Sequence, residues 1–404
     1  MKLPDLTSDI PGIGGRLKSR PEDFVVEELP LYPPSGEGTH VFMTVEKRGA
    51  STAAAADMIA RALGRRRHDV GFAGQKDVHA VARQTLSIEH VDPDQAARLN
   101  LPGIRVLGVA RHGHKLRLGH LAGNRFDLRV RGLAVDPRAA LGLAQAATAV
   151  LQRRGAPNYF GPQRFGAAGN NGLIGRAALL GRYQEAVDGI VGADSDRDRP
   201  DVREARRLCR AGDYHAAAPA WPRSFQSEAR ICRTLARGGD PRVAWLSVDQ
   251  KMRKFYLNAF QSELFNEVLA ERIDRIDRLE DGDVAWLHAG GACFLVQDVR
   301  REQPRCEAFE ISPTGPQFGA GMLQPAGATA AAERRVLEAN RLCTPDFQTP
   351  DGMYAHGARR PLRVPVRFDE VSIGTDEYGS FLRLRFDLPA GAFATSVMRE
   401  IMKG

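Results

Sequence analysis

The chain has 404 residues, of which 43% are hydrophobic and 26% are charged, and its formal net charge is +8. This composition is that of a water-soluble globular protein, and the length exceeds one ordinary hydrophobic core, so we expect two domains. No apolar run of about 18 residues occurs, which excludes a membrane-spanning helix. The basic surplus is compatible with a polyanionic partner such as RNA or DNA.

The N-terminus and the cysteines are both typical of a reducing compartment. Residues 1–5 are polar and contain a proline, with no apolar segment of signal-peptide length, so we expect a cytoplasmic protein. The cysteines are widely spaced and form no CxxC pair. They are Cys209, Cys232, Cys293, Cys306 and Cys343. We therefore expect free buried thiols, rather than a disulfide framework or a zinc site.

The first part of the chain is predicted to be rich in strands. Apolar residues in partial alternation predict strands over residues 24–28, 40–46, 83–88, 104–111, 115–118 and 125–131. Ser51 or Thr52 can cap a helix over about residues 53–63. A short helix near residues 93–99 and a longer one over residues 136–153 complete this part.

The second part is predicted to be mostly helical before it returns to strands. Helical patterns cover residues 177–191 and 201–211, with a polar loop over 194–200 between them. The longest helix is expected over 257–273, where Phe260, Leu264 and Val268 form an apolar stripe that favours a core position. The remaining predictions are strands and turns over 280–320, a helix over 331–342, strands over 361–368 and 381–388, and a final helix over 395–402.

A glycine-rich stretch, GFAGQKD at residues 71–77, places Asp77 beside Lys76 after a short apolar run. Glycine lets the backbone approach a ligand closely, and an aspartate held there is a candidate nucleophile or base. The structural alternative is a strand-to-turn junction with an exposed Lys-Asp pair. Arg65, Arg66 and Arg67 just upstream also have two interpretations, a solvated helix C-terminus or contact with RNA phosphates.

Basic and aromatic residues continue after Asp77. Residues 105–131 hold seven arginines and lysines, and Arg125, Arg129 and Arg131 would share one strand face. The histidines at 112, 114 and 120 have no carboxylate cluster nearby, so we expect no metal there. Residues 155–166 combine glycines, three aromatic rings and Arg164, which suits either a loop that stacks on bases or an aromatic-packed turn between domains.

Several common enzyme motifs are missing from the sequence. It contains no GxxxxGK[ST] phosphate loop, no GxGxxG fingerprint after a strand, no GxSxG elbow and no HExxH pair. Nucleotide hydrolysis, dinucleotide binding and zinc-protease activity are therefore unsupported.

Seven stretches, taken in order, resemble the TruD family of tRNA pseudouridine synthases. They are residues 17–28, 34–40, 71–84, 115–126, 158–166 (NYFGPQRFG), 258–266 and 388–400 (LPAGAFATSVMRE). Together they span nearly the whole chain. Two positions depart from the family pattern: Val78 stands where a basic residue is usual, and Ala82 stands where a threonine is expected. These departures concern a local RNA contact and a hydrogen bond.

The resemblance implies an α+β fold. A pseudouridine-synthase catalytic domain, with a mixed, mainly antiparallel sheet and flanking helices, would cover residues 1–152 and 358–404. A second α+β domain, the TRUD domain, would be inserted at 153–357. The implied activity is that of an isomerase (an intramolecular transfer) that converts uridine to pseudouridine in RNA, at uridine 13 of tRNA, with no cofactor and no metal. The expected partner is tRNA, and we expect a monomer that does not bind membranes.

The resemblance also implies roles for individual residues. Asp77 would be the catalytic nucleophile or base, acting on the ribose or on the uracil ring. Lys18 would be its cationic partner, with Lys76 as the second choice. Phe126 would pack on a base flipped out of the RNA stack, and Asn124 would hydrogen-bond in the site. The residues expected to contact substrate are Phe24, Lys76, Asn124, Phe126 and Arg164.

Other functions stay open at this stage. The same fold could act on another RNA, and residues 172–250, which are longer than in compact bacterial members, could alter that choice. A non-catalytic RNA-binding or chaperone protein could keep the fold. A methyltransferase or a nuclease is disfavoured because the sequence has neither a cofactor-binding glycine loop nor a metal-carboxylate cluster.

Overall fold

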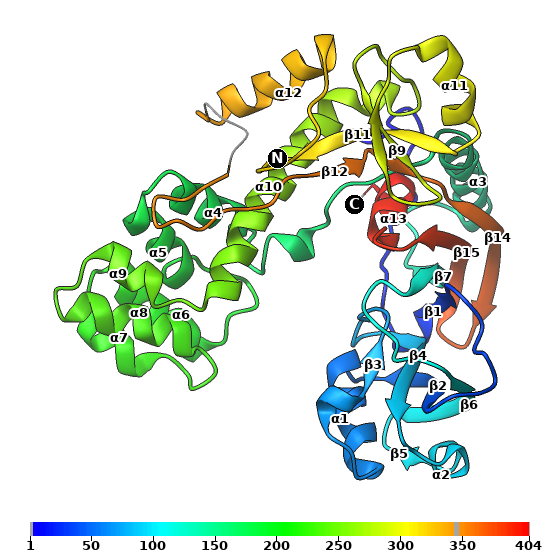
Figure 1. The fold of residues 1–404 in the computed structure, drawn as a ribbon, viewed down its shortest axis with the longest axis horizontal. Helices are drawn as coiled ribbons and strands as arrows, with labels where there is room; N and C mark the ends of the chain where they lie inside the picture. Colours follow the sequence, from blue (N-terminus) through cyan, green and yellow to red (C-terminus); the bar gives the residue numbers. More distant parts are fainter. Residues whose placement is uncertain (1–2, 343–346, 404) are drawn as a thin grey trace. The chain divides into compact units, whose positions relative to one another are not determined.

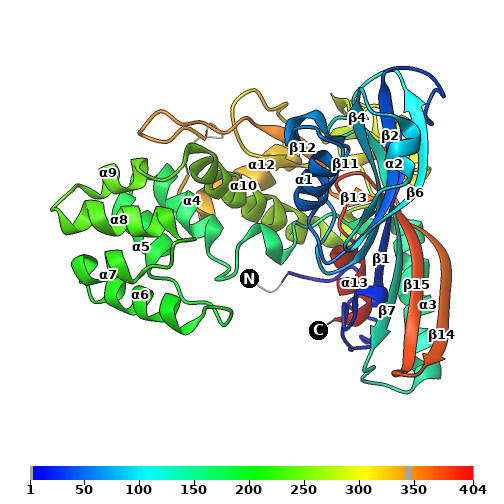
Figure 2. The ribbon, with the colours of Figure 1, turned by 90° about the horizontal axis from the view of Figure 1, so that it is seen from below.

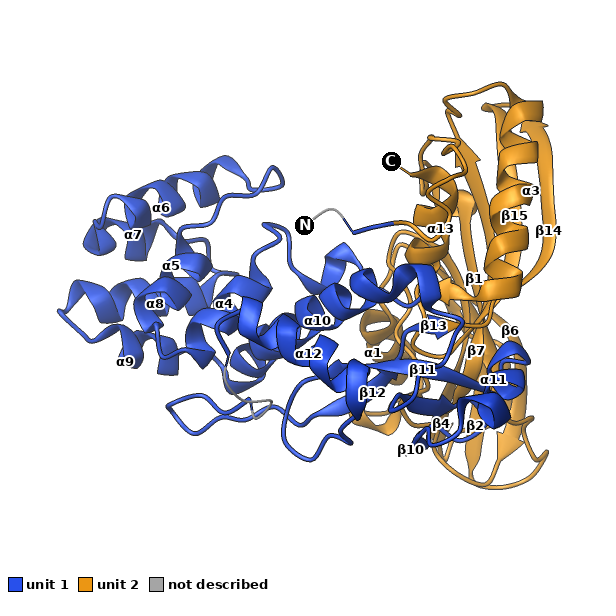
Figure 3. Cartoon of the chain, turned by 90° about the horizontal axis from the view of Figure 1, so that it is seen from above, with its two compact units in different colours: residues 1–4, 157–363 blue, residues 5–156, 364–404 orange. Residues whose placement is uncertain are grey.

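The computed structural model describes residues 3–342 and 347–403 and divides into two compact units (Figures 1 and 3). Unit 1 comprises Met1–Pro4 and Pro157–Arg363, and unit 2 comprises Asp5–Ala156 and Val364–Gly404. The sequence-based boundaries, 152 and 357, lie a few residues before these crossings. That unit 2 is the catalytic domain and unit 1 the inserted one stays a prediction. No helix in the described ranges is long and apolar enough to cross a membrane.

A nine-stranded sheet forms the frame of unit 2 (Figure 2). Its strands are β1 (Phe24–Pro30), β2 (His40–Arg48), β3 (Gly71–Phe72), β4 (Val81–Glu89), β5 (Asn100–Leu101), β6 (Ile104–His112), β7 (Leu121–Arg131), β14 (Arg367–Asp376) and β15 (Gly379–Pro389). The order is β14-β15-β7-β1-β4-β2-β6-β5, with β3 beside β4. Strands β1 and β4 run parallel and the other described pairs are antiparallel, so the expected mixed, mainly antiparallel sheet is confirmed.

Helices of unit 2 pack on this sheet. They are α1 (Thr52–Ala62), α2 (Pro93–Ala97), α3 (Pro137–Arg154) and α13 (Ala394–Met402), with short 3-10 turns η1 (Pro21–Asp23) and η2 (Arg67–Asp69). Val41, Met43 and Val45 of β2 are buried in one cluster with Ala56 and Ile59 of α1. Because alternate residues of a strand share a face, β2 presents this row to α1.

The N-cap of α1 is Ser51 rather than Thr52. The Ser51 hydroxyl accepts a hydrogen bond from the Ala54 amide at 3.1 Å. The Thr52 side chain is buried and serves another contact. Ser51 therefore satisfies an amide that would otherwise lack a helical partner.

Cross-strand ion pairs cover one face of β7 and β15. Arg125, Arg129 and Arg131 share this face, as predicted from their spacing. Arg125 donates two hydrogen bonds of 2.9 Å to Asp387, and Arg131 binds Asp23 at 2.8 Å. Since these arginines have carboxylate partners, much of the basic charge of the middle segment is neutralised within the sheet.

Unit 1 begins with short helices and continues with a small sheet. Its helices are α4 (Asn171–Leu179), α5 (Tyr183–Val191), α6 (Pro200–Arg210), α7 (Tyr214–Ala220), α8 (Gln226–Ala236), α9 (Pro241–Leu246), α10 (Gln250–Arg272), α11 (Val299–Glu307) and α12 (Gly327–Ala339), with 3-10 turns η3 (Pro162–Arg164) and η4 (Ile273–Arg275). Strands β9 (Val284–Leu287), β10 (Cys293–Leu295), β11 (Ile311–Gln317) and β12 (Ala358–Pro361) form a sheet in the order β10-β9-β11-β12. Short strands β8 (Ala156–Pro157) and β13 (Arg363–Val364) lie where the chain crosses between units.

Buried apolar side chains form the core of helices α4 to α9, the region whose role the sequence left open. Trp221 and Trp245 lie in this core together with Cys209 and Cys232, whose sulfur atoms are 3.3 Å apart. The cysteines of the described ranges are free, as expected. Cys306 is buried, as are Cys209 and Cys232, whereas Cys293 is only half-buried and does not meet the expectation of a buried thiol. Cys343 lies outside the described residues.

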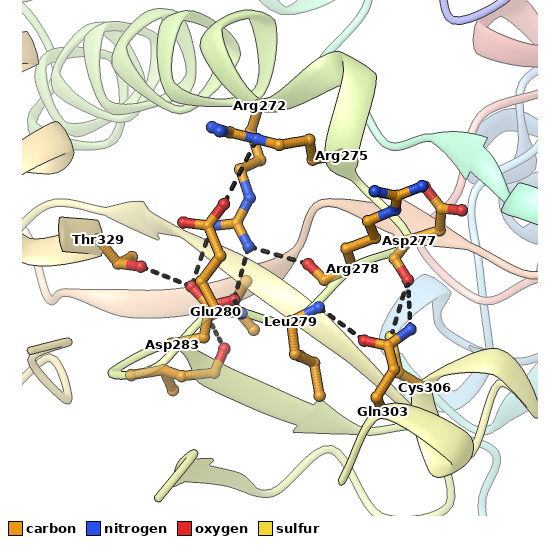
Figure 4. A network of polar contacts seen from close by, with 12 residues as sticks. Arg272, Arg275, Asp277, Arg278, Leu279, Glu280, Asp283, Gln303, Cys306 and Thr329 are labelled. Carbon is orange, nitrogen blue, oxygen red and sulfur yellow. Dashed lines mark hydrogen bonds and ion pairs between the residues drawn. The ribbon is translucent and has the colours of Figure 1, made fainter. Parts of the chain in front are cut away.

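A network of charged and polar contacts joins the end of α10 to β9 (Figure 4). The Arg272 guanidinium donates to both oxygens of the buried Asp283, at 3.0 and 2.6 Å. Asp283 also accepts a 2.7 Å bond from the Thr329 hydroxyl and a 2.8 Å bond from the Glu280 amide. A buried carboxylate with this many donors is held for structural reasons.

Several predicted elements differ from the structure. Residues 177–191 form two helices because the chain turns at Gly181, whose φ is +70°. The predicted strand over 361–368 is broken because Pro365 has no amide to donate to a sheet. Helix α11 interrupts the strands expected over 280–320, and the helix expected from 257 begins at Gln250.

Residues 115–118 do not form the predicted strand. The Leu116 amide donates instead to the Ser87 hydroxyl at 2.9 Å, and the segment continues into a turn in which the Gly119 amide donates to the Ala73 carbonyl at 2.8 Å. The local basic and apolar alternation was misleading because these side-chain and loop contacts replace a strand partner.

Candidate active site

Asp77 lies in the loop that joins β3 to β4. The loop follows the two-residue strand β3, which begins at Gly71, where a side chain is excluded because a Cβ atom would lie 2.2 Å from the Leu116 carbonyl oxygen. The strand-to-turn junction foreseen in the sequence is therefore present, and its first glycine is required by close packing. Within this loop the Asp77 side chain is 54% exposed. Its carboxylate is accessible to a large substrate.

Lys18 is the ion-pair partner of Asp77. The Lys18 Nζ atom lies 2.6 Å from Asp77 Oδ2. The same Nζ atom lies 4.3 Å from the centre of the Phe24 ring, which places the cation between the ring and the carboxylate. Lys18 has a φ of +58°, an uncommon backbone angle for a residue other than glycine. Such angles occur preferentially at functional sites, where surrounding contacts hold them.

Lys76, the second choice for this pairing, lies on another carboxylate. Its Nζ atom is 2.8 Å from Glu28 Oε2, and both side chains are buried. The other Glu28 oxygen accepts a 3.3 Å bond from the Thr85 amide. Lys76 thus joins the loop to β1 and does not neutralise Asp77. Its expected contact with substrate stays a prediction, which this burial does not favour.

Aromatic rings support the site from the sheet. Phe24 packs edge-on to Phe126 with ring centres 6.1 Å apart, and Phe126 stacks on Phe386 at 5.4 Å. All three rings are buried. Phe24, Phe126 and Phe386 thus form a wall of aromatic rings next to Lys18. The packing of Phe126 on a flipped base stays a prediction.

Asn124 lies two residues before Phe126 on the same face of β7, opposite Glu28 of β1. Its Oδ1 atom is buried and accepts no hydrogen bond within the part of the chain that the structure describes. A buried acceptor without a donor is costly, so it is a suitable partner for a donor brought by a ligand. This agrees with the expectation that Asn124 hydrogen-bonds in the site.

Sequence reasoning missed three polar residues beneath the loop. Thr52 accepts a 2.9 Å bond from the Lys76 amide and donates one of 2.9 Å to Gln84. Lys47 of β2 is fully buried, and its Nζ atom donates to the Asp77 carbonyl at 2.9 Å. The signal for Lys47 was present in the alternation of β2, where a charged residue continues the apolar row of Val41, Met43 and Val45.

The three histidines considered for a metal bind one another and Tyr32. His112 and His114 have Nε2 atoms 3.2 Å apart, and the Tyr32 hydroxyl is 2.7 Å from His120 Nδ1. The Ser35 amide donates to His112 Nδ1, which assigns the ring proton of His112 to Nε2, the atom that faces His114. Within residues 3–342 and 347–403 no group of three or more potential ligands could hold a metal ion.

Arg164 belongs to unit 1 and lies against two aromatic rings of that unit. Its guanidinium lies 5.2 Å from the centre of the Phe160 ring and 5.8 Å from that of Phe255. Burial lowers the pKa of Arg164. The Phe160 amide donates to Asn266 of α10 at 2.9 Å, which anchors the 158–166 loop as a packed turn. Contact between Arg164 and substrate stays a prediction.

The arrangement in unit 2 combines an accessible carboxylate, an adjacent cation, a buried amide oxygen and a wall of rings. The cation donates a hydrogen bond to the carboxylate, and a carboxylate acts as a nucleophile or base in its ionised form. The rings and the amide can position a flat, polar ring such as a nucleobase. The site therefore suits chemistry on an extruded base or its sugar.

Comparisons with known proteins agree on one family. The family model described as tRNA pseudouridine synthase D (TruD) matches residues 2–401. A protein from Geobacter metallireducens named tRNA pseudouridine synthase D is 46% identical over 400 residues, covering 99% of this chain and 97% of the relative. A protein of the same name from Anaeromyxobacter dehalogenans (strain 2CP-1) is 40% identical over 411 residues, covering 100% and 97%.

The fold is shared with a solved structure. A crystal structure from Methanosarcina mazei, assigned to tRNA pseudouridine synthase D, superposes with a TM-score of 0.86 at 24% identity, covering 100% of this chain and 99% of that one. At this identity the likeness concerns the fold, whereas the family model and the two relatives align with almost the whole length of the chain. The chain belongs to the tRNA pseudouridine synthase D (TruD) family.

Proposed function

We propose that this protein isomerises uridine 13 of tRNA to pseudouridine, with Asp77 as the catalytic carboxylate and Lys18 as its cationic partner. The observation that carries the proposal is the 2.6 Å ion pair between Lys18 and Asp77, two residues from separate family-like stretches of the sequence. Membership of the TruD family supports the reaction class and the tRNA substrate. The cytoplasm, where tRNA is available, is the proposed location.

The proposed reaction conserves all atoms of the nucleotide. The bond between uracil N1 and ribose C1′ breaks, the base rotates, and a bond forms between C5 and C1′. The proton on C5 leaves and a proton is gained at N1. Asp77 acts in this sequence as a nucleophile, on C1′ or on the uracil ring, or as a base for the departing proton.

Positioning of the base falls to the wall beside Asp77. A base within an RNA stack is inaccessible, so the target must be flipped out at a cost of about a few kcal/mol. Asn124 Oδ1 is an acceptor suited to the N3–H group of uracil, which cytosine lacks. Phe126 and Phe24 supply the apolar surface on which the base would rest.

Phosphate contacts come from arginines without carboxylate partners. Arg65, Arg66 and Arg67 follow α1 and make no ion pair within the described residues, in contrast to the neutralised arginines of β7. Arg67 stacks 5.2 Å from the centre of the Phe72 ring, next to the loop that bears Asp77. We assign these arginines to RNA phosphates rather than to a solvated helix end alone.

The test is a tritium-release assay with tRNA transcripts labelled at C5 of uridine, followed by mapping of pseudouridine by chemical modification and primer extension. Release of tritium with a single modified site at uridine 13 is the expected result. Modification of other positions or of other RNAs would keep the reaction class and change the substrate. Tight tRNA binding without any release would instead support the non-catalytic RNA-binding alternative.

A further inference from the structure

The feature that the proposed mechanism does not use is the buried ammonium group of Lys47. Lys47 follows Val41, Met43 and Val45 along the face of β2 that packs on α1, and its residue exposure is 0%. Taking an ammonium group out of water costs several kcal/mol, so an aliphatic side chain would serve the core better. The lysine therefore needs a reason other than packing.

All three hydrogen bonds of this ammonium group go to backbone carbonyls. Lys47 Nζ donates to Asp77 O at 2.9 Å, to Lys76 O at 3.3 Å and to Ala50 O at 2.7 Å. The Ala50 carbonyl belongs to the turn before α1, whereas the other two belong to the catalytic loop. An ammonium group has three donors, so these bonds use its whole capacity.

We propose that Lys47 is a positioning residue that holds the backbone of Asp77 and Lys76 so that the Asp77 carboxylate meets its target. The claim rests on the proposed function, in which Asp77 is the catalytic carboxylate. Thr52 fixes the same loop through the Lys76 amide at 2.9 Å, and Glu28 holds the Lys76 side chain. Together these contacts anchor the backbone of the loop and leave the Asp77 carboxylate accessible, with Lys18 as its ion-pair partner.

The protonation of Lys47 provides a readout that a purely structural role would not give. The pKa of Lys47 is lowered to about 8: burial is the main cause, the Asp77 carboxylate opposes it, and the Lys76 ammonium group adds a smaller lowering. Above this pH the neutral amine has two donors, so one of the three carbonyls loses its bond. The charged groups that face Lys47 are Asp77 and Lys76, both on the loop, and Lys76 is itself paired with Glu28.

The sign of the linkage separates loss of activity from loss of fold. In the unfolded chain Lys47 keeps its proton to about pH 10.4. Between pH 8 and that value the unfolded state therefore binds more protons than the folded state, so this group makes folding more favourable as pH rises. A fall in turnover over the same range cannot come from unfolding caused by Lys47.

The experiment compares Lys47→Met with Arg48→Met, a matched change at the next position, whose side chain is exposed and lies on the opposite face of β2. Single-turnover rates, the tRNA dissociation constant and hydrogen–deuterium exchange of residues 73–80 are measured for each. For Lys47→Met we expect a rate loss of roughly 100-fold, since small misplacements of reacting groups have effects of that size. We also expect unchanged tRNA affinity and faster hydrogen–deuterium exchange of the loop. The additional fall in rate above pH 8 that deprotonation of Lys47 causes in the wild-type protein should be absent from the variant.

Several results would overturn the assignment. Equal rates for the two variants would do so, as would unchanged loop exchange or a loss of tRNA affinity that parallels the loss of rate. If Lys47→Met does not fold, Lys47→Gln and the pH profile of the wild-type protein take its place. A wild-type rate that does not change between pH 7 and 9.5 would contradict the proposal. A wild-type protein without turnover would count against the proposed function, and loop exchange would still decide whether Lys47 positions the loop.

Discussion

Two charged networks of this protein are built from similar parts and end differently. In unit 1, Asp283 is buried, and each of its oxygens accepts two hydrogen bonds, from Arg272, Thr329 and the Glu280 amide. In unit 2, the carboxylate of Asp77 is 54% exposed and accepts, among the described contacts, a hydrogen bond from Lys18. The carboxylate of Asp283 is fully hydrogen-bonded by protein donors, whereas the carboxylate of Asp77 is largely exposed, and in the same unit the buried Asn124 Oδ1 atom has no donor within the described residues.

The difference teaches where to look for function among buried charges. Lys76 and Glu28 form a buried ion pair, as Arg272 and Asp283 do, and the Lys47 ammonium group has three carbonyl partners. Buried charges with such partners mark structure as often as chemistry. The exposed carboxylate of Asp77 and the buried oxygen of Asn124 lack a full set of protein donors, so they mark the place where a ligand can complete the contacts. Changes at Asp77 and its partner Lys18 should remove turnover, and changes in the Asp283 network of unit 1 should remove stability.

The largest effect is expected for Asp77→Asn. The amide cannot act as a nucleophile or base, so tritium release should fall by about 10⁴-fold or more while tRNA binding persists. Asp69→Asn, a change in the nearby turn η2, is the matched control and should leave turnover intact. Retained turnover in Asp77→Asn would show that the Asp77 carboxylate is not the catalytic group.

Lys18→Met should have the next largest effect. Removing the cation leaves the Asp77 carboxylate without its described donor, and we expect a loss of roughly 100-fold in the single-turnover rate. Lys254→Met, an exposed lysine of unit 1, serves as the control. Circular dichroism should show an unchanged fold, and a rate like that of the control would place the cationic partner elsewhere.

Asp283→Asn tests the buried network around Asp283 in unit 1. Breaking this buried pair removes the nearest carboxylate of Arg272 and leaves the longer contact to Glu280 at 3.7 Å, so the free energy of unfolding should fall by about 3 kcal/mol. Turnover per folded molecule, measured well below the unfolding temperature, should not change. The exposed neighbour Asp281→Asn is the control for urea unfolding. A specific loss of turnover in Asp283→Asn would remove the distinction between the two networks.

The smallest effect is expected for Val78→Lys. Val78 is 38% exposed, directly follows Asp77 and replaces the basic residue usual in the family. A lysine there should add about one phosphate contact, seen as a modest gain in tRNA affinity and a steeper salt dependence. Leu107→Lys, an exposed position on β6, controls for general charge. Equal gains in both variants would argue against a specific contact at position 78.

Much of the fold could be predicted because local patterns and tertiary packing agree. Strands β1, β2, β4 and β7 and helix α3 follow their apolar alternation or their capping residues. The failures occur where distant contacts decide the outcome. Residues 115–118 alternate like a strand but bind Ser87 and Ala73, and Gly181 divides a continuous helical pattern.

The site was predictable through family-like motifs and only partly through chemistry. Asp77, Lys18, Phe24, Phe126 and Asn124 are found in one neighbourhood of unit 2, although their roles stay predictions. The partner of Lys76 could not be read from the sequence, because Glu28 lies 48 positions away on β1. Lys47 was overlooked because an isolated lysine near a strand end is usually solvated.

The split of unit 2 across the sequence has a consequence for its synthesis. Strand β7 pairs with β1 and with β15, and Arg125 and Asp387 of β7 and β15 are 262 positions apart. A growing chain therefore completes β7 long before its second neighbour exists, and the open edge of β7 is exposed to wrong pairing during that interval. Every proposed site residue precedes residue 165, yet Phe126 gains its stacking partner Phe386 only when β15 has been made. Ribosome-bound chains should stay inactive until then, whatever the state of unit 1.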